Sequence, residues 1–317
     1  MIFETKIADI PIRFSGELND AFLERVAPYE YKIKDDEEFI LINYKLCSNI
    51  VLPTDRKTIK TISDREWFYD GDKYCYADFN EQIGKYTVII STRGNICDID
   101  MYDFHDKDEI DKITDALRQY KKTMPNPKER DEADKVCFNP DMPLINSTDQ
   151  AVRFPFLLNN VFSIHSSAIS YKNNGIIFSA PSGTGKSTHT SLWKKVFEDD
   201  VTIVNDDSPL IGVHNNGAVL YGSPWAGASG INVNSTSPLK AIVFLEQAPQ
   251  NSIEKLPTIF ALRYLLKQIR IPFDKDMTDK VYTLLNLLLY TVPCYLLKCL
   301  PDENAVMTVK NMIFEGE

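Results

Sequence analysis

Cysteine is scarce in this sequence, and the few cysteines are scattered. Six occur among 317 residues, no two form a CxxC pair, and no histidine lies near one at metal-ligand spacing. The spacing gives no sign of a disulfide framework or a zinc site. We therefore expect ordinary reduced thiols in a cytoplasmic protein.

Long apolar segments are also lacking. The longest uncharged run, residues 281–297, is too short for a membrane-spanning helix and contains Asn286 and Pro293. The first residues show neither the basic start nor the apolar core of a secretory signal. We therefore expect no membrane segment.

Positive charge is in short supply, with 35 Lys and Arg against 45 Asp and Glu and a formal net charge of −10. Binding to nucleic acid or to an anionic membrane surface needs clustered basic residues, so we predict neither as a partner. What the sequence does contain, 44% apolar and 25% charged residues, is typical of a globular protein. A length of 317 residues suffices for two domains.

The first half of the chain has the alternating pattern of short strands. Apolar and polar residues alternate over residues 38–46 and 85–102, and Arg93-Gly94-Asn95 predicts a hairpin turn within the second run. A helical period begins at Asp108, which we expect to cap the helix, and continues to near Met124. The residues on the expected apolar face are Ile110, Ile113, Leu117 and Tyr120.

A change of composition marks the expected domain boundary. Residues 126–135 are strongly charged and residues 138–149 contain two more prolines, which favours a linker or surface excursion. We predict a smaller β-rich N-terminal domain with one helix over residues 1–150, with substrate recognition as its candidate role. A second domain is expected over residues 151–317.

The second half of the chain mixes hairpins with helices. Asn174-Gly175 predicts a hairpin that pairs residues 167–171 antiparallel with residues 175–180, and Asn216-Gly217 predicts another. The other expected elements are a helix over 187–198, strands over 201–207, 241–248 and 294–300, and helices beginning near residues 258, 278 and 302. The sequence thus predicts an α/β (α+β) fold with a mixed, partly antiparallel sheet.

One glycine-rich turn carries a chemical signal. Residues 180–187, Ala-Pro-Ser-Gly-Thr-Gly-Lys-Ser, fit the P-loop (Walker A) pattern, with Ala180 in place of its first glycine. Glycines let successive backbone N–H groups point inward, and the following helix adds its positive end. The residues expected to bind ATP are Ser182, Gly183, Thr184, Gly185, Lys186, Ser187 and Thr188. Lys186 would reach the outer phosphates and Ser187 would bind Mg²⁺, unless the segment is an ordinary Ser/Gly-rich turn.

Two further features could complete a site. Asp206 and Asp207 follow the strand after the loop, the usual place for a Mg²⁺-binding carboxylate, although adjacent strand residues point to opposite faces and a bend is needed for both to serve. His165 lies on the strand before the first hairpin, which would bring it beside the loop strand. A lone histidine among apolar residues is otherwise a core residue.

Taken together, the histidine strand, the hairpin, "SGTGKST" and the strand ending in Asp-Asp resemble the catalytic core of the HPr serine kinase and phosphoenolpyruvate carboxykinase group. The resemblance covers about residues 160–250 and is closest to the HPr-kinase-like proteins associated with peptide-modification pathways. It implies the P-loop type of that group, ATP and Mg²⁺, and His165, Lys186, Asp206 and Asp207 as catalytic residues. Ser187 and Asp206 are the candidate metal ligands, although the metal and base roles of Asp206 and Asp207 stay interchangeable.

The resemblance implies a kinase that transfers the γ-phosphoryl group of ATP to a serine hydroxyl of a peptide or small protein. Carboxykinases of the group are longer and use arginines to hold a small dicarboxylate, whereas only Arg263 and Arg270 follow Arg153 here. A small-molecule kinase or carboxykinase-like enzyme is one alternative, and a non-catalytic ATP-binding sensor or scaffold is another. A second copy of the chain, in a homo-oligomer, is a further candidate partner.

Two tryptophans and one glycine-rich loop also need an interpretation. Core packing is expected for Trp193, while Trp225 could either pack or stack on adenine. Residues 222–230 could form a flap over the substrate or a plain surface loop.

Overall fold

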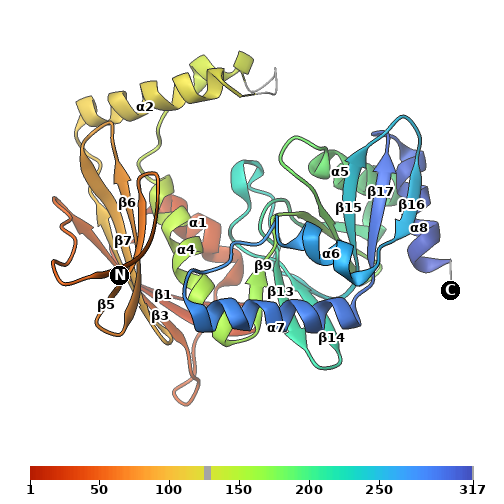
Figure 1. Cartoon of the computed structure of the whole chain (residues 1–317), viewed down its shortest axis with the longest axis horizontal. Helices are drawn as coiled ribbons and strands as arrows, with labels where there is room; N and C mark the ends of the chain where they lie inside the picture. The colour runs from red at the N-terminus through yellow and green to blue at the C-terminus, as the bar shows by residue number, and fades with distance from the viewer. Residues whose placement is uncertain (125–129, 316–317) are drawn as a thin grey trace. The chain divides into compact units, whose positions relative to one another are not determined.

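The computed structural model describes residues 1–124 and 130–315, and it is a mixed α/β protein with two sheets (Figure 1). Its contacts divide the chain into two compact units. The first comprises Met1–Thr5 and Pro11–Pro155, and the second comprises Lys6–Ile10 and Phe156–Glu317. Residues 125–129, part of the expected linker, lie outside the described residues.

The first unit is built on an eight-stranded sheet, in agreement with the β-rich pattern of its sequence. The strand order is β1-β2-β3-β8-β7-β6-β5-β4. The strands are β1 (Ile2–Ile7), β2 (Ile10–Gly16), β3 (Ile40–Cys47), β4 (Lys57–Ile62), β5 (Arg65–Asp70), β6 (Lys73–Asn80), β7 (Lys85–Arg93) and β8 (Ile96–Tyr102). Arg93 pairs with Ile96, which confirms the predicted hairpin. The helical segments are α1 (Asp20–Val26), η1 (Ala27–Tyr29), α2 (Lys107–Lys122), η2 (Ala133–Lys135) and α4 (Met142–Leu158).

Helix α2 is present, but its cap and its buried face differ from the prediction. The capping residue is Asp106, whose side chain accepts from the Asp108 backbone N–H. Leu117 and Tyr120 are exposed, Tyr120 to 61%, while Ile113 is buried. The reason lies in the next segment, which packs against a different side of the helix: the Phe138 N–H donates to Thr114 Oγ1.

Helix α4 occupies part of the chain in which the prolines predicted a linker, so that prediction was wrong for residues 142–149. Pro143 lies in the first turn, where a helix needs no N–H donor. Pro155 lies inside the helix and cannot donate to the carbonyl of Ala151. The buried thiol of Cys97 donates to that carbonyl instead, at 3.4 Å. A neighbouring side chain thus replaces the hydrogen bond that proline removes.

The second unit contains a nine-stranded mixed sheet. One path runs β12-β10-β11-β15-β14-β13-β9, and β17 lies beside β15 with β16 beyond it. The strands are β9 (Val161–Ser163), β10 (Ser167–Tyr171), β11 (Asn174–Ser179), β12 (Val201–Asn205), β13 (Leu210–His214), β14 (Gly217–Tyr221), β15 (Thr236–Gln247), β16 (Ser252–Lys255) and β17 (Cys294–Cys299). The helical segments are α5 (Lys186–Phe197), η3 (Glu198–Asp200), η4 (Gly227–Ser229), α6 (Thr258–Leu265), α7 (Lys275–Thr291) and α8 (Glu303–Phe314).

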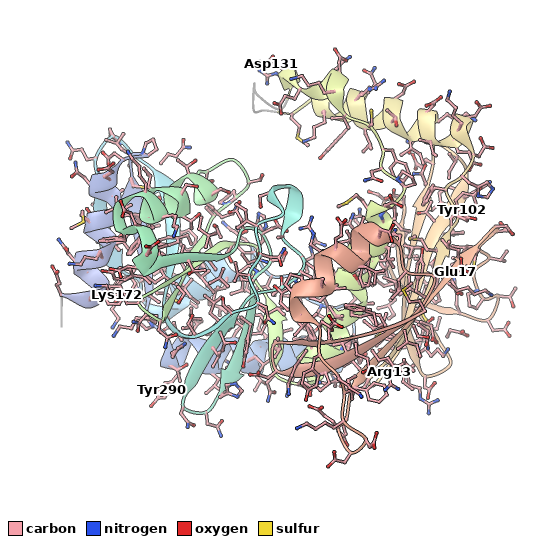
Figure 2. The ribbon with its side chains drawn as sticks, turned by 180° about the vertical axis from the view of Figure 1, so that it is seen from behind. Arg13, Glu17, Tyr102, Asp131, Lys172 and Tyr290 are labelled. Carbon is pink, nitrogen blue, oxygen red and sulfur yellow. The ribbon has the colours of Figure 1, made fainter. Side chains whose placement is uncertain are left out.

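Both predicted hairpins exist, but the first turn lies two residues earlier than its Asn-Gly pair and the second turn lies one residue earlier. Tyr171 pairs with Asn174, so Lys172 and Asn173 form the first turn, both at positive φ (48° and 63°). Lys172 stands at the tip of this hairpin (Figure 2). Gly175 lies inside the strand, where an added Cβ would come within 3.0 Å of Leu220. Close packing, and not the turn, therefore explains this glycine.

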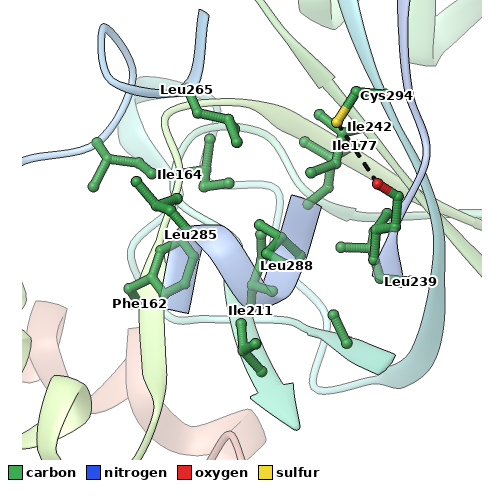
Figure 3. Packing of buried hydrophobic residues seen from close by; sticks show 14 of the residues in the cluster. Phe162, Ile164, Ile177, Ile211, Leu239, Ile242, Leu265, Leu285, Leu288 and Cys294 are labelled. Carbon is green, nitrogen blue, oxygen red and sulfur yellow. Dashed lines mark hydrogen bonds between the residues drawn. The ribbon is translucent and has the colours of Figure 1, made fainter. Parts of the chain in front are cut away.

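Helices bury both faces of the second sheet. Along β11, Ile177 packs in one buried cluster with residues of α6 and α7, whereas Ile176 and Phe178 pack in another with α5 and α8. This alternation is the two-residue period of a strand. Figure 3 shows the first cluster, in which Leu285 and Leu288 of α7 pack with Ile177. Burial of each such side chain stabilises the fold by about 1.5–3 kcal/mol.

Helix α7 contains most of the uncharged run noted in the sequence. One side of it is buried in the cluster of Figure 3, while Tyr290 is 88% exposed and points away from the ribbon (Figure 2). Across the described part of the chain, no helix has both the length and the apolar character that crossing a membrane requires.

A buried histidine on α5 makes stability depend on pH. His189 is 3% exposed, accepts a hydrogen bond from Trp193 Nε1 at 3.2 Å, and has its pKa lowered by burial from 6.5 to about 4. The unfolded chain takes up a proton as pH falls through 6.5, while the folded protein stays neutral until about pH 4. The free energy of unfolding should thus fall by about 3 kcal/mol over this window.

We expect His189→Gln, which keeps an acceptor for Trp193 but does not titrate, to remove this part of the pH dependence. Urea unfolding between pH 4 and 7 measures it. His105→Gln, at an exposed histidine, is the matched control and should leave the slope unchanged. Equal slopes in the wild type and His189→Gln would contradict the assignment.

Candidate functional site

The glycine-rich turn forms an open loop between β11 and α5. Gly183 and Gly185 have φ of +78° and +111°, a region that other residues rarely adopt. Cβ atoms added at either position would meet nothing within 4 Å. Among the described residues, no side chain caps the first N–H groups of α5. Thr184 N–H donates within the loop to the Pro181 carbonyl at 3.3 Å. The uncapped start of α5 presents its first N–H groups and the positive end of a helix, which suits an anion.

Lys186, the first residue of α5, is buried beneath the loop. Its Nζ donates to the Ala180 carbonyl at 2.9 Å and lies 3.1 Å from His165 Nε2. Burial lowers the pKa of Lys186, and the charges of Asp207 and Asp206 oppose that shift. The lysine is therefore held at the base of the loop, facing the histidine and the two carboxylates.

His165 lies at this site and not in the core. Its backbone N–H donates to Gln268 O at 2.9 Å, and its carbonyl accepts from Ser179 Oγ at 3.1 Å. The side chain is 40% exposed. The antiparallel pairing of β10 with β11 sets this position, as the hairpin argument expected.

Asn205 bends the chain after β12 and thereby presents both aspartates. Its buried Nδ2 donates to the carbonyl of Ser223 at 2.9 Å and to Ser223 Oγ at 3.1 Å. Its Oδ1 accepts from the N–H groups of Asp207 and Ser208, at 2.9 and 2.8 Å. Sequence reasoning missed Asn205 and Ser223. An asparagine that ends a strand before Asp-Asp-Ser-Pro is a signal for such an Asx turn.

Asp207 completes a chain of contacts that starts at Lys186. Its Oδ1 lies 3.3 Å from His165 Nδ1, and its Oδ2 accepts from Ser208 Oγ at 3.0 Å. A lysine ammonium can only donate, so His165 Nε2 accepts, Nδ1 carries the proton and Asp207 receives it. Burial raises the pKa of Asp207, but hydrogen bonds from His165 and Ser208 outweigh it, and the net pKa is lowered.

Asp206 differs from Asp207 in its hydrogen bonding. Its Oδ1 is buried and has no hydrogen-bond partner among the described residues. A buried carboxylate oxygen without a donor is costly unless a cation or a ligand donor compensates it. Ser187 is exposed at the first turn of α5. Within the described ranges no group of three or more His, Cys, Asp or Glu side chains could hold a metal by itself. These residues fit Mg²⁺, which combines one or two protein ligands with phosphate oxygens and water.

A pocket of about 720 Å³ adjoins the other side of the loop. Residues Ala180 to Thr184 of the loop line it together with the end of β15 and α6. Gln247 Nε2 fastens the strand end to the loop by donating to Thr184 O at 3.2 Å. Because the strand order is β12-β10-β11-β15, the aspartates and the pocket lie on opposite sides of the loop strand.

The other sequence expectations have mixed outcomes. Trp193 is fully buried, which confirms core packing, and Trp225 is also buried, with its ring 6.0 Å from that of Phe156. Of the two arginines that follow Arg153 in the sequence, Arg263 lines the pocket and Arg270 is not among its lining residues. Residues 222–226 are buried and tied to Asn205, so this part of the loop is neither a flap nor a plain surface loop.

Comparisons with known proteins give little beyond this geometry. No protein-family model matches the chain, and no curated protein matches it. Among solved structures, the chain is similar to the HPr(Ser) kinase/phosphatase from Coxiella burnetii, with 13% identity over 49% of this chain and 89% of that one. The TM-score is 0.29, which is too low to establish a common fold.

Removing the histidine should raise the pKa of Asp207. His165→Phe keeps an aromatic ring but removes the hydrogen-bond donor to Asp207. Burial, which raises the pKa of Asp207, would then be opposed by one hydrogen bond fewer. Titration of the Asp207 carboxyl carbon by NMR, assigned with Asp207→Asn, measures the shift. Ser208→Ala should raise the same pKa by less. An unchanged or lower pKa in His165→Phe would show that the contact does not stabilise the charged form.

Gly227 gives a second test, because it lies against Asp207. A Cβ there would lie 3.0 Å from Asp207 Cβ and Cγ, and the residue has φ +56°. We expect Gly227→Ala to displace the Asp207 carboxylate and to shift the NMR signals of the His165 ring. Gly84→Ala is the matched control, since Gly84 has φ +65° and open space. Both variants should lose about 1–2 kcal/mol of unfolding free energy, but unchanged His165 signals in Gly227→Ala would contradict the contact.

Proposed function

We propose that this protein is an ATP- and Mg²⁺-dependent kinase that transfers the γ-phosphoryl group to a serine hydroxyl of a peptide or small protein. The observation that carries the proposal is a series of side-chain contacts. Lys186 contacts His165, and His165 contacts Asp207, beside the open glycine-rich loop. Phosphoryl transfer needs positioned phosphates, neutralised charge and a base near the attacking oxygen. The loop, Lys186 and the two aspartates supply groups of these kinds.

The contacts support a proposed role for each residue of the site. The N–H groups of the loop and the start of α5 would bind the phosphates, and Lys186 would neutralise charge on the transferred group. Ser187 and Asp206 would hold Mg²⁺, which shields the phosphate oxygens when bound. Asp207 would orient the serine hydroxyl and accept its proton, while His165 keeps Asp207 ionised and fixed in place.

The bonds balance in this scheme. The serine O–H bond breaks and its oxygen forms the new bond to phosphorus. The bond from phosphorus to the bridging oxygen breaks, and ADP leaves with that electron pair. The proton rests on Asp207 and passes to solvent. The buried Oδ1 of Asp206 has no partner among the residues that the structure describes, whereas both oxygens of Asp207 have contacts, and this favours Asp206 as the metal ligand.

The pocket favours one direction for the nucleotide. The aspartates lie toward β12, so the γ-phosphoryl group would lie on that side of the loop. The base and ribose would then occupy the pocket beside β15 and α6, whose volume suits such a group. The serine acceptor would approach from the Asp207 side, with the first unit as the candidate recognition element.

Three variants test this proposal by separate readouts. Lys186→Ala should abolish the rise in melting temperature that ATP gives the wild type. Asp206→Asn should remove the dependence of that rise on Mg²⁺. Asp207→Asn should keep nucleotide binding and lower the transfer rate by about 10²–10⁴-fold, as expected for loss of a general base. Transfer is measured by mass spectrometry on a library of single-serine peptides.

Lys195→Ala is the matched control, because Lys195 lies on the same helix but pairs with Glu303 at the surface. It should behave as the wild type. Normal transfer in all three site variants would exclude the proposal. A melting shift with ATP but no phosphorylated peptide would favour the non-catalytic sensor, and product formed from metabolites without peptide would favour a small-molecule kinase or carboxykinase-like enzyme.

A further inference from the structure

We propose that Glu246 accepts hydrogen bonds from the ribose hydroxyls of the nucleotide, so that the protein selects ribonucleotides over deoxyribonucleotides. This inference rests on the proposed nucleotide site and assigns a specificity role within it. Glu246 is the penultimate residue of β15 and lines the pocket beside the loop.

The carboxylate is fixed in position by an aromatic neighbour. Tyr264 of α6 donates its hydroxyl to Glu246 Oε1 at 2.6 Å. The Tyr264 ring stacks on that of Phe244, with centroids 4.8 Å apart and planes at 24°. Phe244 and Glu246 are two residues apart on the strand and so share the face that α6 covers. One oxygen of the carboxylate is thereby anchored to the core.

The second oxygen has the freedom to bind a ligand. No hydrogen bond to Glu246 Oε2 is formed within the part of the chain that the structure describes, and the residue is only half-buried. An ionised carboxylate only accepts hydrogen bonds, so it selects donors. In ATP the donors are the ribose hydroxyls and the amino group of adenine, because the phosphates are anionic and would be repelled.

The rest of the pocket leaves the ribose as the best partner. Arg263 lies over the exposed ring of Phe260 at 5.7 Å, a flat surface of aromatic and cationic character that suits stacking by a base. Gln247, next to Glu246, holds Thr184 of the loop. The Glu246 carboxylate therefore lies next to Gln247, which contacts the glycine-rich loop. The ribose is the part of a nucleotide that lies next to the phosphates, and acidic residues bind its hydroxyls in other nucleotide sites.

The experiment compares three nucleotides on four proteins. Dissociation constants for ATP, dATP and inosine triphosphate, each with Mg²⁺, are measured by calorimetry on the wild type, Glu246→Gln, Tyr264→Phe and Glu254→Gln. The wild type should bind ATP about 10- to 100-fold more tightly than dATP, as expected for loss of one hydrogen bond to a charged group. It should bind inosine triphosphate, which lacks the amino group, about as well as ATP.

The variants assign this preference to the residue. Glu246→Gln should bring the ATP to dATP ratio close to one, and Tyr264→Phe should reduce it in part by releasing the carboxylate. Glu254→Gln, at an exposed glutamate of β16, which is separated from β15 by β17, is the control and should keep the wild-type ratio.

The failures are distinguishable. If the wild type binds ATP and dATP equally, the ribose assignment is overturned while the proposed kinase site stands. If inosine triphosphate binds weakly and dATP binds well, Glu246 contacts the base and the assignment is again overturned. If no nucleotide binds, the proposed function itself falls, and the role of Glu246 falls with it.

Discussion

The site depends on the position of one short strand, β10. It pairs antiparallel with β11, which leads into the glycine-rich loop, and antiparallel with β12, which leads into the aspartates. His165 enters just before β10, at the same edge of the sheet. A strand between two antiparallel neighbours starts where both of them end. The start of β10 therefore lies beside the ends of β11 and β12, and this brings together His165, the glycine-rich loop and the two aspartates. The contacts from Lys186 through His165 to Asp207 are a consequence of that arrangement.

The second constraint is the side-chain amide of Asn205, whose nitrogen and oxygen both form hydrogen bonds. A buried side-chain amide that makes bonds with both its nitrogen and its oxygen holds the chain on either side of it, because each lost bond leaves a buried polar group unpaired. Here the oxygen holds the turn of Asp207 and Ser208, and the nitrogen holds Ser223. Gly227 then fits against Asp207 where no side chain would. The preorganised carboxylates are thus supported from a loop that contributes no charge itself.

Much of this was visible in the sequence, and the limits have physical causes. The hairpins, the loop and the Asp-Asp strand end have local signals, since turn chemistry and strand period act over a few residues. The shift of the turn to Lys172 and Asn173 was not visible, because Gly175 is required by packing against Leu220, which is distant in sequence. Helix α4 was missed for the same kind of reason: Cys97, far along the chain, satisfies the carbonyl that Pro155 leaves free. The partners of Asn205 likewise come from a loop eighteen residues away.

The charged side chains differ between the two sides of the loop. On the β12 side, Asp206 and Asp207 place negative charge beside the loop, and the charges of both act on Lys186. In the proposed function, this negative charge would hold a metal ion and an acceptor hydroxyl. On the β15 side, Arg263 and Lys267 face the pocket together with Glu246 and the aromatic rings. A triphosphate is attracted to the loop itself and repelled by carboxylates on both sides unless a cation or a hydroxyl intervenes. The two ends of a nucleoside triphosphate differ in this respect, because a metal ion would bind phosphate oxygens whereas the hydroxyls belong to the ribose. In the proposed function, the asymmetry of the carboxylates about the loop strand would therefore favour one orientation of a nucleotide over its reverse.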